Sequence, residues 1–142
     1  MRSMALGIPV LLCGCSSGDF RTAPATGRVI CEGQPVPHVM VFFEPLQTNT
    51  KSALVGKQGF AIAKEDGTFS ISTYGTNDGA VVGPHRVRVG PPHREEHPDF
   101  KCACVLNPET DVMQVEVKKG KNEFELVLKK KTGREPPVKK DD

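Results

Sequence analysis

Two short stretches of this chain carry residue types that can bind metals or act as nucleophiles. The first, HREEH at 93–97, has the H-x-x-E-H pattern of inverted zinc proteases, which place two histidines on one face of a helix. Prolines at 91, 92 and 98 enclose it, and a single turn does not form a stable helix. We therefore expect no peptidase chemistry, and an enzyme such as a hydrolase ranks third among the functions considered.

The same region offers a different kind of metal site. His93, His97, Cys102 and Cys104 lie within twelve residues, and thiolates together with imidazoles suit zinc. Their spacing matches no common zinc finger. A metal-holding module built on these four residues is therefore the alternative function. The preferred interpretation is a solvated loop whose cysteines pack inward, with no cofactor.

The second stretch is the N-terminus, MRSMALGIPVLLCGC, with one Arg, an apolar run over 4–12 and then small residues. The run is too short to span a bilayer and has the arrangement of an export signal. LCGC at 12–15 resembles the bacterial lipobox, whose cysteine receives diacylglycerol after cleavage. We predict a lipoprotein signal peptide over 1–14 and acylation of Cys15, as with palmitate. The alternatives are a plain signal peptide, or a frayed chain end in which the cysteine occurs by chance.

The residues after Cys15 bear on location. Ser16 is not the aspartate that retains lipoproteins at the inner membrane. We expect an extracytoplasmic protein, lipid-anchored to the outer membrane and facing the periplasm. Residues 15–25 are predicted to be a polar tether, because Pro24 favours an extended chain.

Three further cysteines, Cys31, Cys102 and Cys104, would remain in the mature chain. Export favours disulfides, but an odd number leaves at least one thiol free. A bridge from Cys31 to either Cys102 or Cys104 is left open. Small buried thiols without a bridge are the preferred interpretation.

Composition limits the partners. The 142 residues include 19 basic and 17 acidic side chains, a net charge of +2, with no Trp and one Tyr. This overall balance gives no reason to expect nucleic acid or an acidic membrane surface as a partner, and few aromatic rings are present to stack on sugars or bases.

Alternation of apolar and polar residues recurs along most of the chain, as in HVMVFFEP at 38–45 and HRVRV at 85–89. Asp66-Gly67 lies between two alternating runs, which predicts a hairpin. About seven short strands with closely spaced turns indicate an all-β protein, an antiparallel β-sandwich. We assign the sandwich to 26–130 and expect a disordered charged tail over 131–142.

These residues also suggest a family. TGRVICEGQPVPHVMVFFEP at 26–45 resembles the opening of carboxypeptidase regulatory-like domains, and KEDGTFSISTYGTNDGAVVGPHRVRV at 64–89 is similar to the central segment found in planctomycete-type lipoproteins. VEVKKGKNEFELVL at 115–128 resembles the closing hairpin. The resemblance implies a seven-stranded transthyretin-like, or prealbumin-like, antiparallel β-sandwich. It implies no peptidase activity.

The loop YGTNDGAVVGP at 74–84 interrupts the alternation, and we expect it to be an architectural connection. Glycines at 75, 79 and 83 permit positive φ, and Asp78 can bond backbone amides ahead of it. Asp78, Gly79, Gly83 and His85 are therefore structural candidates. The chain as a whole is expected to be a non-catalytic, lipid-anchored envelope module that has a structural role or binds an unidentified protein or glycan.

Overall fold

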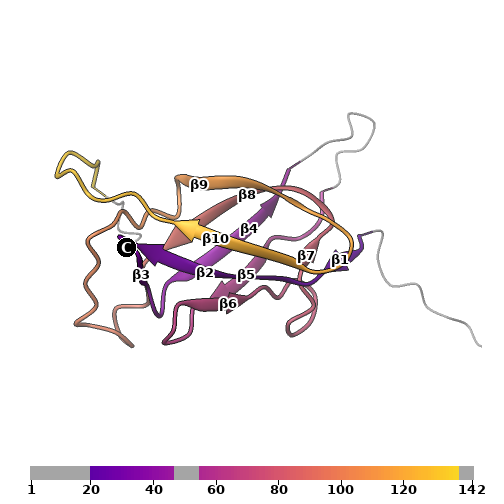
Figure 1. Ribbon diagram of the computed structural model, residues 1–142, viewed down its shortest axis with the longest axis horizontal. Helices are drawn as coiled ribbons and strands as arrows, with labels where there is room; N and C mark the ends of the chain where they lie inside the picture. Colours follow the sequence, from indigo (N-terminus) through magenta and orange to yellow (C-terminus); the bar gives the residue numbers. More distant parts are fainter. Residues whose placement is uncertain (1–19, 47–54, 138–142) are drawn as a thin grey trace, which may run out of the picture.

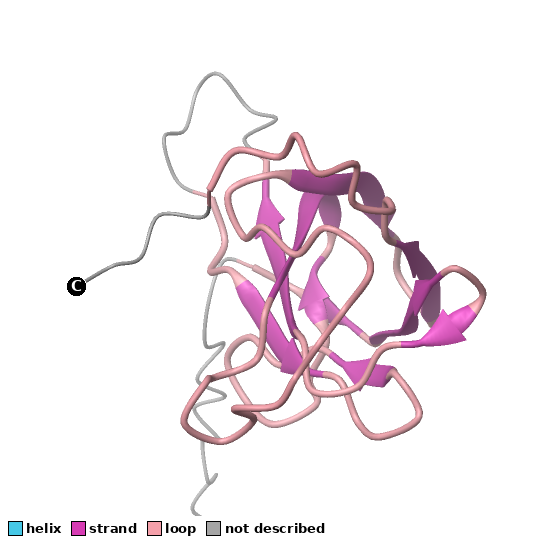
Figure 2. Cartoon of the chain, turned by 90° about the vertical axis from the view of Figure 1, so that its left-hand side faces the viewer, coloured by secondary structure: helices cyan, strands magenta, loops and turns pink. Residues whose placement is uncertain are grey.

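The computed structural model describes residues 20–46 and 55–137, and residues 1–19, 47–54 and 138–142 lie outside the described part. The described residues form strands and loops and contain no helix, which confirms the all-β prediction (Figures 1 and 2). Accordingly, no helix in this part could cross a membrane. Ten strand segments replace the expected seven, because three of them, β1, β3 and β7, are only two residues long.

The strands form two four-stranded sheets and a small two-stranded one. The first sheet has the order β10-β2-β3, with β6 also paired to β2, and it contains Asn122–Val127, Ala25–Cys31, Gln34–Pro35 and Thr68–Ser70. The second has the order β5-β4-β8-β9 and contains Gly59–Ile62, Met40–Pro45, Gly83–Gly90 and Asp111–Val117. β1 (Thr22–Ala23) pairs with β7 (Ala80–Val81).

The core lies between the two large sheets and follows the alternation in the sequence. Val41, Phe43, Val87 and Val89 are completely buried on the inner face of the second sheet. The ring of Phe43 reaches across to the first sheet, where it packs edge-on against Phe69 and Phe124, with centroids 6.2 and 5.5 Å away. Burying each such side chain contributes about 1.5–3 kcal/mol. The predicted sandwich is thus confirmed.

Two expected hairpin turns connect strands that belong to different sheets. At the Asp66-Gly67 turn the Lys64 amide donates to the Thr68 carbonyl at 2.8 Å, and Phe60 and Ser72 form an antiparallel bridge in the same register, as in a hairpin. Beyond this bridge, β5 belongs to the second sheet and β6 to the first. The turn between β9 and β10 also joins the second sheet to the first, where β10 pairs with β2 in parallel. Both turns therefore carry the chain from one sheet to the other, and the first keeps its hairpin pairing.

Different strands and loops lie at the two ends of the sandwich. β1, β7 and the turn between β9 and β10 lie at one end, and the long segment between β8 and β9 lies at the other (Figure 1). β1 and the start of β2 fall inside the predicted tether, so the folded part begins before Thr26. Within the predicted tail, the Glu135 carboxylate accepts the amides of Thr132 and Gly133, which gives 131–137 a local turn.

Candidate functional site

The loop between β6 and β8 is organised around the carboxylate of Asp78. Oδ1 accepts the amide of Thr73 at 2.7 Å, and Oδ2 accepts those of Tyr74 and Gly75, both at 3.0 Å. Three successive backbone amides directed at one point form an anion-binding nest. Asp78 fills that nest, so these amides are not free for an external anion. The bonded residues precede Asp78 in the chain.

The loop glycines play unequal parts. Gly79 and Gly83 have φ of +90° and +132°, whereas the third residue of the loop with positive φ is Asn77, at +54°, and not Gly75. Thr73 Oγ1 donates to the Gly79 carbonyl at 2.6 Å and is buried. Ala80 and Val81 are buried, as expected for residues that close the end of the sandwich. These contacts favour the architectural interpretation of the loop.

His85, the last residue of the predicted loop set, is 1% exposed. Its Nδ1 lies 3.0 Å from the Gly83 carbonyl, so Nδ1–H is the donor, and Nε2 has no hydrogen-bond partner in the described part of the chain. Burial lowers the pKa of His85 and outweighs the opposing effects of the Gly83 carbonyl and the Glu116 carboxylate. The imidazole is therefore neutral and enclosed, and it holds the Gly83 turn in place rather than meeting a substrate.

Other residues of the family-like pattern also have structural tasks. Gly27 lies between Phe69 and Phe124, and a Cβ atom on it would come within 2.6 Å of the Phe69 ring. Gly67 has φ of +78° and would bring a Cβ within 2.8 Å of Pro35. Asp66 Oδ1 accepts the Thr68 amide and hydroxyl. The pattern thus describes how the sandwich packs and turns.

The structure corrects the preferred interpretation of the cysteines. Cys31 and Cys104 form a disulfide with a Cα–Cα distance of 5.9 Å, and Cys102 is a half-buried free thiol. The bridge ties the end of β2 to the segment that enters β9. Nothing local in the sequence distinguished Cys104 from Cys102, since both could face Cys31.

The four candidate metal ligands do not form one site. The Cys104 sulfur is bonded to Cys31, so it cannot act as a thiolate ligand. His97 stacks on His38 with ring centroids 3.9 Å apart and planes inclined by 14°. An imidazole nitrogen binds a metal that lies in the plane of its own ring, at about 2.0 Å. The stacked rings of His38 and His97 therefore cannot both bind one metal ion. Among the described residues no group of three or more potential ligands is placed to hold a metal.

His38 is a residue that the sequence reasoning missed. It has φ of +67°, and its Nε2 is 3.0 Å from the Glu65 carboxylate. Its stacking on His97 fastens the HREEH segment to the turn before β4. The HREEH segment itself is a turn in which the His97 amide donates to the His93 carbonyl at 3.0 Å.

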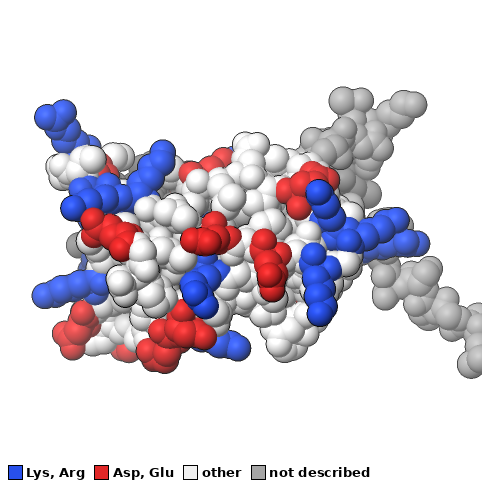
Figure 3. All heavy atoms as spheres, viewed as in Figure 1, with Lys and Arg blue, Asp and Glu red and all other residues white. Residues whose placement is uncertain are grey.

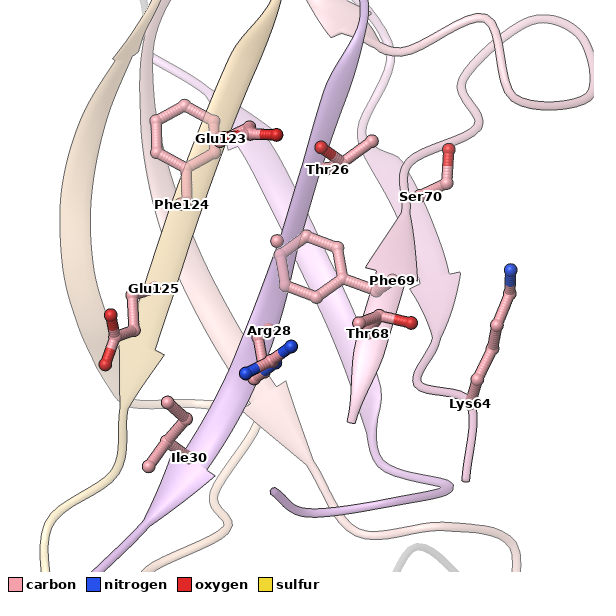
Figure 4. Close-up of a pocket in the computed structure, with 11 residues that line it drawn as sticks. Thr26, Arg28, Ile30, Lys64, Thr68, Phe69, Ser70, Glu123, Phe124 and Glu125 are labelled. Atoms are coloured by element: carbon pink, nitrogen blue, oxygen red, sulfur yellow. The ribbon is translucent and has the colours of Figure 1, made fainter. Parts of the chain in front are cut away.

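A shallow hollow of about 580 Å³ lies over β10, β2 and β6 (Figure 4). Arg28 lies across the sheet from Glu125 on one side and Thr68 on the other, and Lys64 stands at the edge of the hollow (Figure 4). Hydroxyl groups of Thr26 and Ser70 add further hydrogen-bonding groups. The hollow combines both charges with hydroxyls, which are groups that can form hydrogen bonds and ion pairs with a polar ligand. Sequence alternation alone did not reveal it, because it depends on which strands pair.

The predicted lipidation site, Cys15, lies outside the described residues, as does the signal peptide before it. No family model matches the sequence. No curated protein matches it either.

Among solved structures, the chain is similar to a DUF3823 family protein from Parabacteroides merdae ATCC 43184, determined in a crystal at 1.80 Å resolution. The match has 21% identity and a TM-score of 0.46, and it covers 79% of this chain and 48% of that one. The chain thus spans about half of that protein's length, and the likeness concerns the β-rich fold alone.

Proposed function

We propose that the chain is a non-catalytic module of the cell envelope, held by acylated Cys15 and acting as a structural element or a binder of a protein or glycan. The lipobox-like LCGC at 12–15 supports the anchor. Ser16 in place of aspartate supports the outer membrane, with the module facing the periplasm.

The observation that carries this proposal is the disulfide between Cys31 and Cys104. Disulfides persist in oxidising compartments such as the periplasm and are rare in the cytosol. The bridge therefore supports export independently of the N-terminal sequence.

The sandwich is, in this proposal, a carboxypeptidase regulatory-like domain. The residues of the family-like pattern occupy positions where the fold needs that residue type. Gly27 lies between Phe69 and Phe124, Gly67 forms a tight turn, and the Asp78 carboxylate accepts backbone amides of its own loop. A pattern made of structural residues supports shared architecture and gives no support to shared catalysis.

A binding role is favoured over chemistry because three of the groups able to react are already engaged. Asp78 is occupied by amides, His85 is enclosed in the core and Cys104 is oxidised. The hollow around Arg28 is the place where we expect a polar partner to bind, with the carboxylates of β10 on one side and the hydroxyls of β6 on the other.

Expression of the full chain in its native type of cell tests the anchor. Intact-mass analysis should show loss of residues 1–14 and a gain of lipid, and Cys15→Ala should abolish both and release the protein from membranes. An uncleaved mutant that stays in the membrane would show that Cys15 is not the anchor.

The binding role is tested separately with the anchored protein. Cross-linking and pull-down from the native envelope should recover a partner with wild type and lose it with Arg28→Glu. Glu109→Arg, an exposed charge reversal away from the hollow, is the matched control. Equal recovery with wild type and Arg28→Glu would exclude the hollow as the binding surface.

A further inference from the structure

Four separate segments meet at the end of the sandwich where β1 enters. Thr22 and Ala23 pair with Val81 and Ala80 of β7. The Pro24 carbonyl, which follows directly, accepts both the amide and the side chain of Asn122, at 3.0 and 3.1 Å. Asn122 thereby holds the turn between β9 and β10 against the N-terminal strand.

The segment before β5 and the Asp78 loop complete this end. A Cβ atom on Gly56 would come within 2.5 Å of the Val81 side chain, which places Gly56 directly on β7. The Tyr74 hydroxyl accepts the amide of Lys57 at 3.1 Å. We call residues 20–24, 55–57, 74–79 and 118–121 the tether end.

The tether end exposes apolar and aromatic surface. Tyr74 is 54% exposed and Val55 is 43% exposed. Phe20, the first described residue, is half-buried. Tyr is enriched where proteins meet the boundary between lipid and water, because its ring is apolar and its hydroxyl is polar.

The tether end is also basic. Its exposed cationic side chains are Arg21, Lys57, Lys118, Lys119 and Lys121. Its one carboxylate is that of Asp78, which the backbone amides of its own loop surround. Glu116 and Glu123 flank the lysine turn from the adjoining strands. Figure 3 shows Lys and Arg side chains at this end, on the right as β1 is in Figure 1, and others at the opposite end.

We propose that the tether end is a membrane-contact surface that binds the anionic headgroups of the bilayer holding the lipid anchor. The inference rests on the proposed acylation of Cys15. Cys15 and Phe20 are five residues apart, which limits the distance between their Cα atoms to about 18 Å. Electrostatic attraction to a charged bilayer acts over a Debye length of about 8–10 Å. A tether of this length therefore allows these cations to come within a Debye length of the headgroups.

Two features together point to lipid rather than to a soluble partner. The anchor limits which surface can be near the bilayer, and the end nearest to it carries basic side chains beside an exposed aromatic ring. Clusters of Lys and Arg next to a membrane anchor bind anionic lipids. One lipid anchor is strengthened by a basic patch in the same way.

The fluorescence of Tyr74 is a specific probe of the tether end. Tyr74 is the single Tyr and the chain has no Trp, so its fluorescence reports on the tether end alone. The lipidated full-length protein is reconstituted into phosphatidylcholine vesicles with or without phosphatidylglycerol, each containing brominated lipid. We expect at least twofold stronger quenching of Tyr74 by brominated lipid when phosphatidylglycerol is present.

Charge reversal locates the effect. Replacing Lys118, Lys119 and Lys121 by Glu should remove the dependence on phosphatidylglycerol. The matched control replaces Lys129, Lys130 and Lys131 by Glu, since these exposed residues follow β10 at the opposite end of the strand. The control should keep the full response.

Each other outcome overturns the inference. If intact mass shows lipid on the protein but Tyr74 is not quenched, the surface does not contact the bilayer although the anchor proposal stands. If mass shows no lipid, both proposals fail. Equal loss of response in the two triple variants would mean that net charge, and not the tether end, determines the contact. Protection of Tyr74 in native envelopes but not in vesicles would assign the surface to a protein partner.

Discussion

Gly79 lies directly against the main chain of Ala23. A Cβ atom on Gly79 would overlap the Ala23 carbonyl and lie 2.9 Å from the Cα of Pro24. The Gly79 amide donates to the Ile71 carbonyl at 2.9 Å, so the residue cannot move away without losing that bond. This contact joins the loop after β6 to the N-terminal strand, and it explains why the alternation in the sequence stops there.

We expect Gly79→Val to lower the free energy of unfolding by about 3 kcal/mol, since it adds a clash with main-chain atoms to a φ of +90°. Gly75→Val is the matched control, because a Cβ on Gly75 would meet no atom within 4 Å. It should change stability by less than about 0.5 kcal/mol. Urea denaturation measures both. If the two variants have equal midpoints and only Gly79→Val loses a partner in pull-down, the loop is a binding site.

Asp78→Ala should cost about 2–3 kcal/mol at pH 7, more than the value of about 1 kcal/mol expected for one ordinary hydrogen bond. The carboxylate accepts three amides, and removing it leaves them without that partner. Asp99→Ala, at an exposed position, is the control and should have little effect.

The same variant has a distinct dependence on pH. Burial raises the pKa of Asp78, but the amide bonds from Thr73, Tyr74 and Gly75 outweigh it and lower the pKa overall. The stabilisation by Asp78 is thus complete above the unfolded pKa of about 3.9 and is lost as the pH falls through the lowered folded value. The difference in unfolding free energy between wild type and Asp78→Ala should shrink below about pH 4. A difference that stays constant down to pH 2.5 would exclude this role.

The local parts of the fold were predictable from the sequence. Alternation over 38–45 placed Val39, Val41 and Phe43 on one face of a strand, and all three are completely buried. The Asp66-Gly67 turn was equally visible, because positive φ at a glycine and an Asp side chain that bonds its own backbone are properties of a few neighbouring residues.

The non-local parts were not predictable in the same way. Alternation assigns a residue to a face, but it does not say that β10 lies beside β2 in parallel or that the arms of a turn enter different sheets. The Cys31–Cys104 bridge spans 73 positions of sequence, and the His38–His97 stack likewise joins distant loops. For the candidate site, Asp78 was found because its partners are local, whereas the neighbours of Arg28 follow from strand pairing.

The disulfide should dominate the stability of the domain. Closing a loop of this length constrains the unfolded chain, and loss of such a bridge typically costs 2–5 kcal/mol. We expect Cys31→Ala with Cys104→Ala to fall in this range, with Cys102→Ala, the matched control, changing stability by less than about 1 kcal/mol. Urea denaturation measures both changes.

The pairing can be checked by peptide mapping. Alkylation of the native protein should modify Cys102, which is half-buried, and spare Cys31 and Cys104. A mapped bridge between Cys31 and Cys102, or a midpoint insensitive to the double replacement, would contradict this assignment.

His85 should make the protein less stable in mild acid. Burial lowers its pKa below the ordinary value of 6.5 despite the bond to the Gly83 carbonyl. Between the folded pKa and about 6.5 the unfolded chain therefore binds more protons, so stability rises with pH across this window and levels off above it. One proton limits this slope to about 1.4 kcal/mol per pH unit.

Replacing His85 isolates this contribution. His85→Asn retains a side-chain donor near the position of Nδ1 but cannot titrate. The unfolding free energy of this variant should therefore rise less steeply than that of wild type between pH 5 and 6.5. Urea denaturation at half-unit pH steps measures both proteins. Identical slopes for wild type and His85→Asn would show that folding does not lower the pKa of His85, which would contradict the enclosed imidazole on which the architectural role of the loop depends.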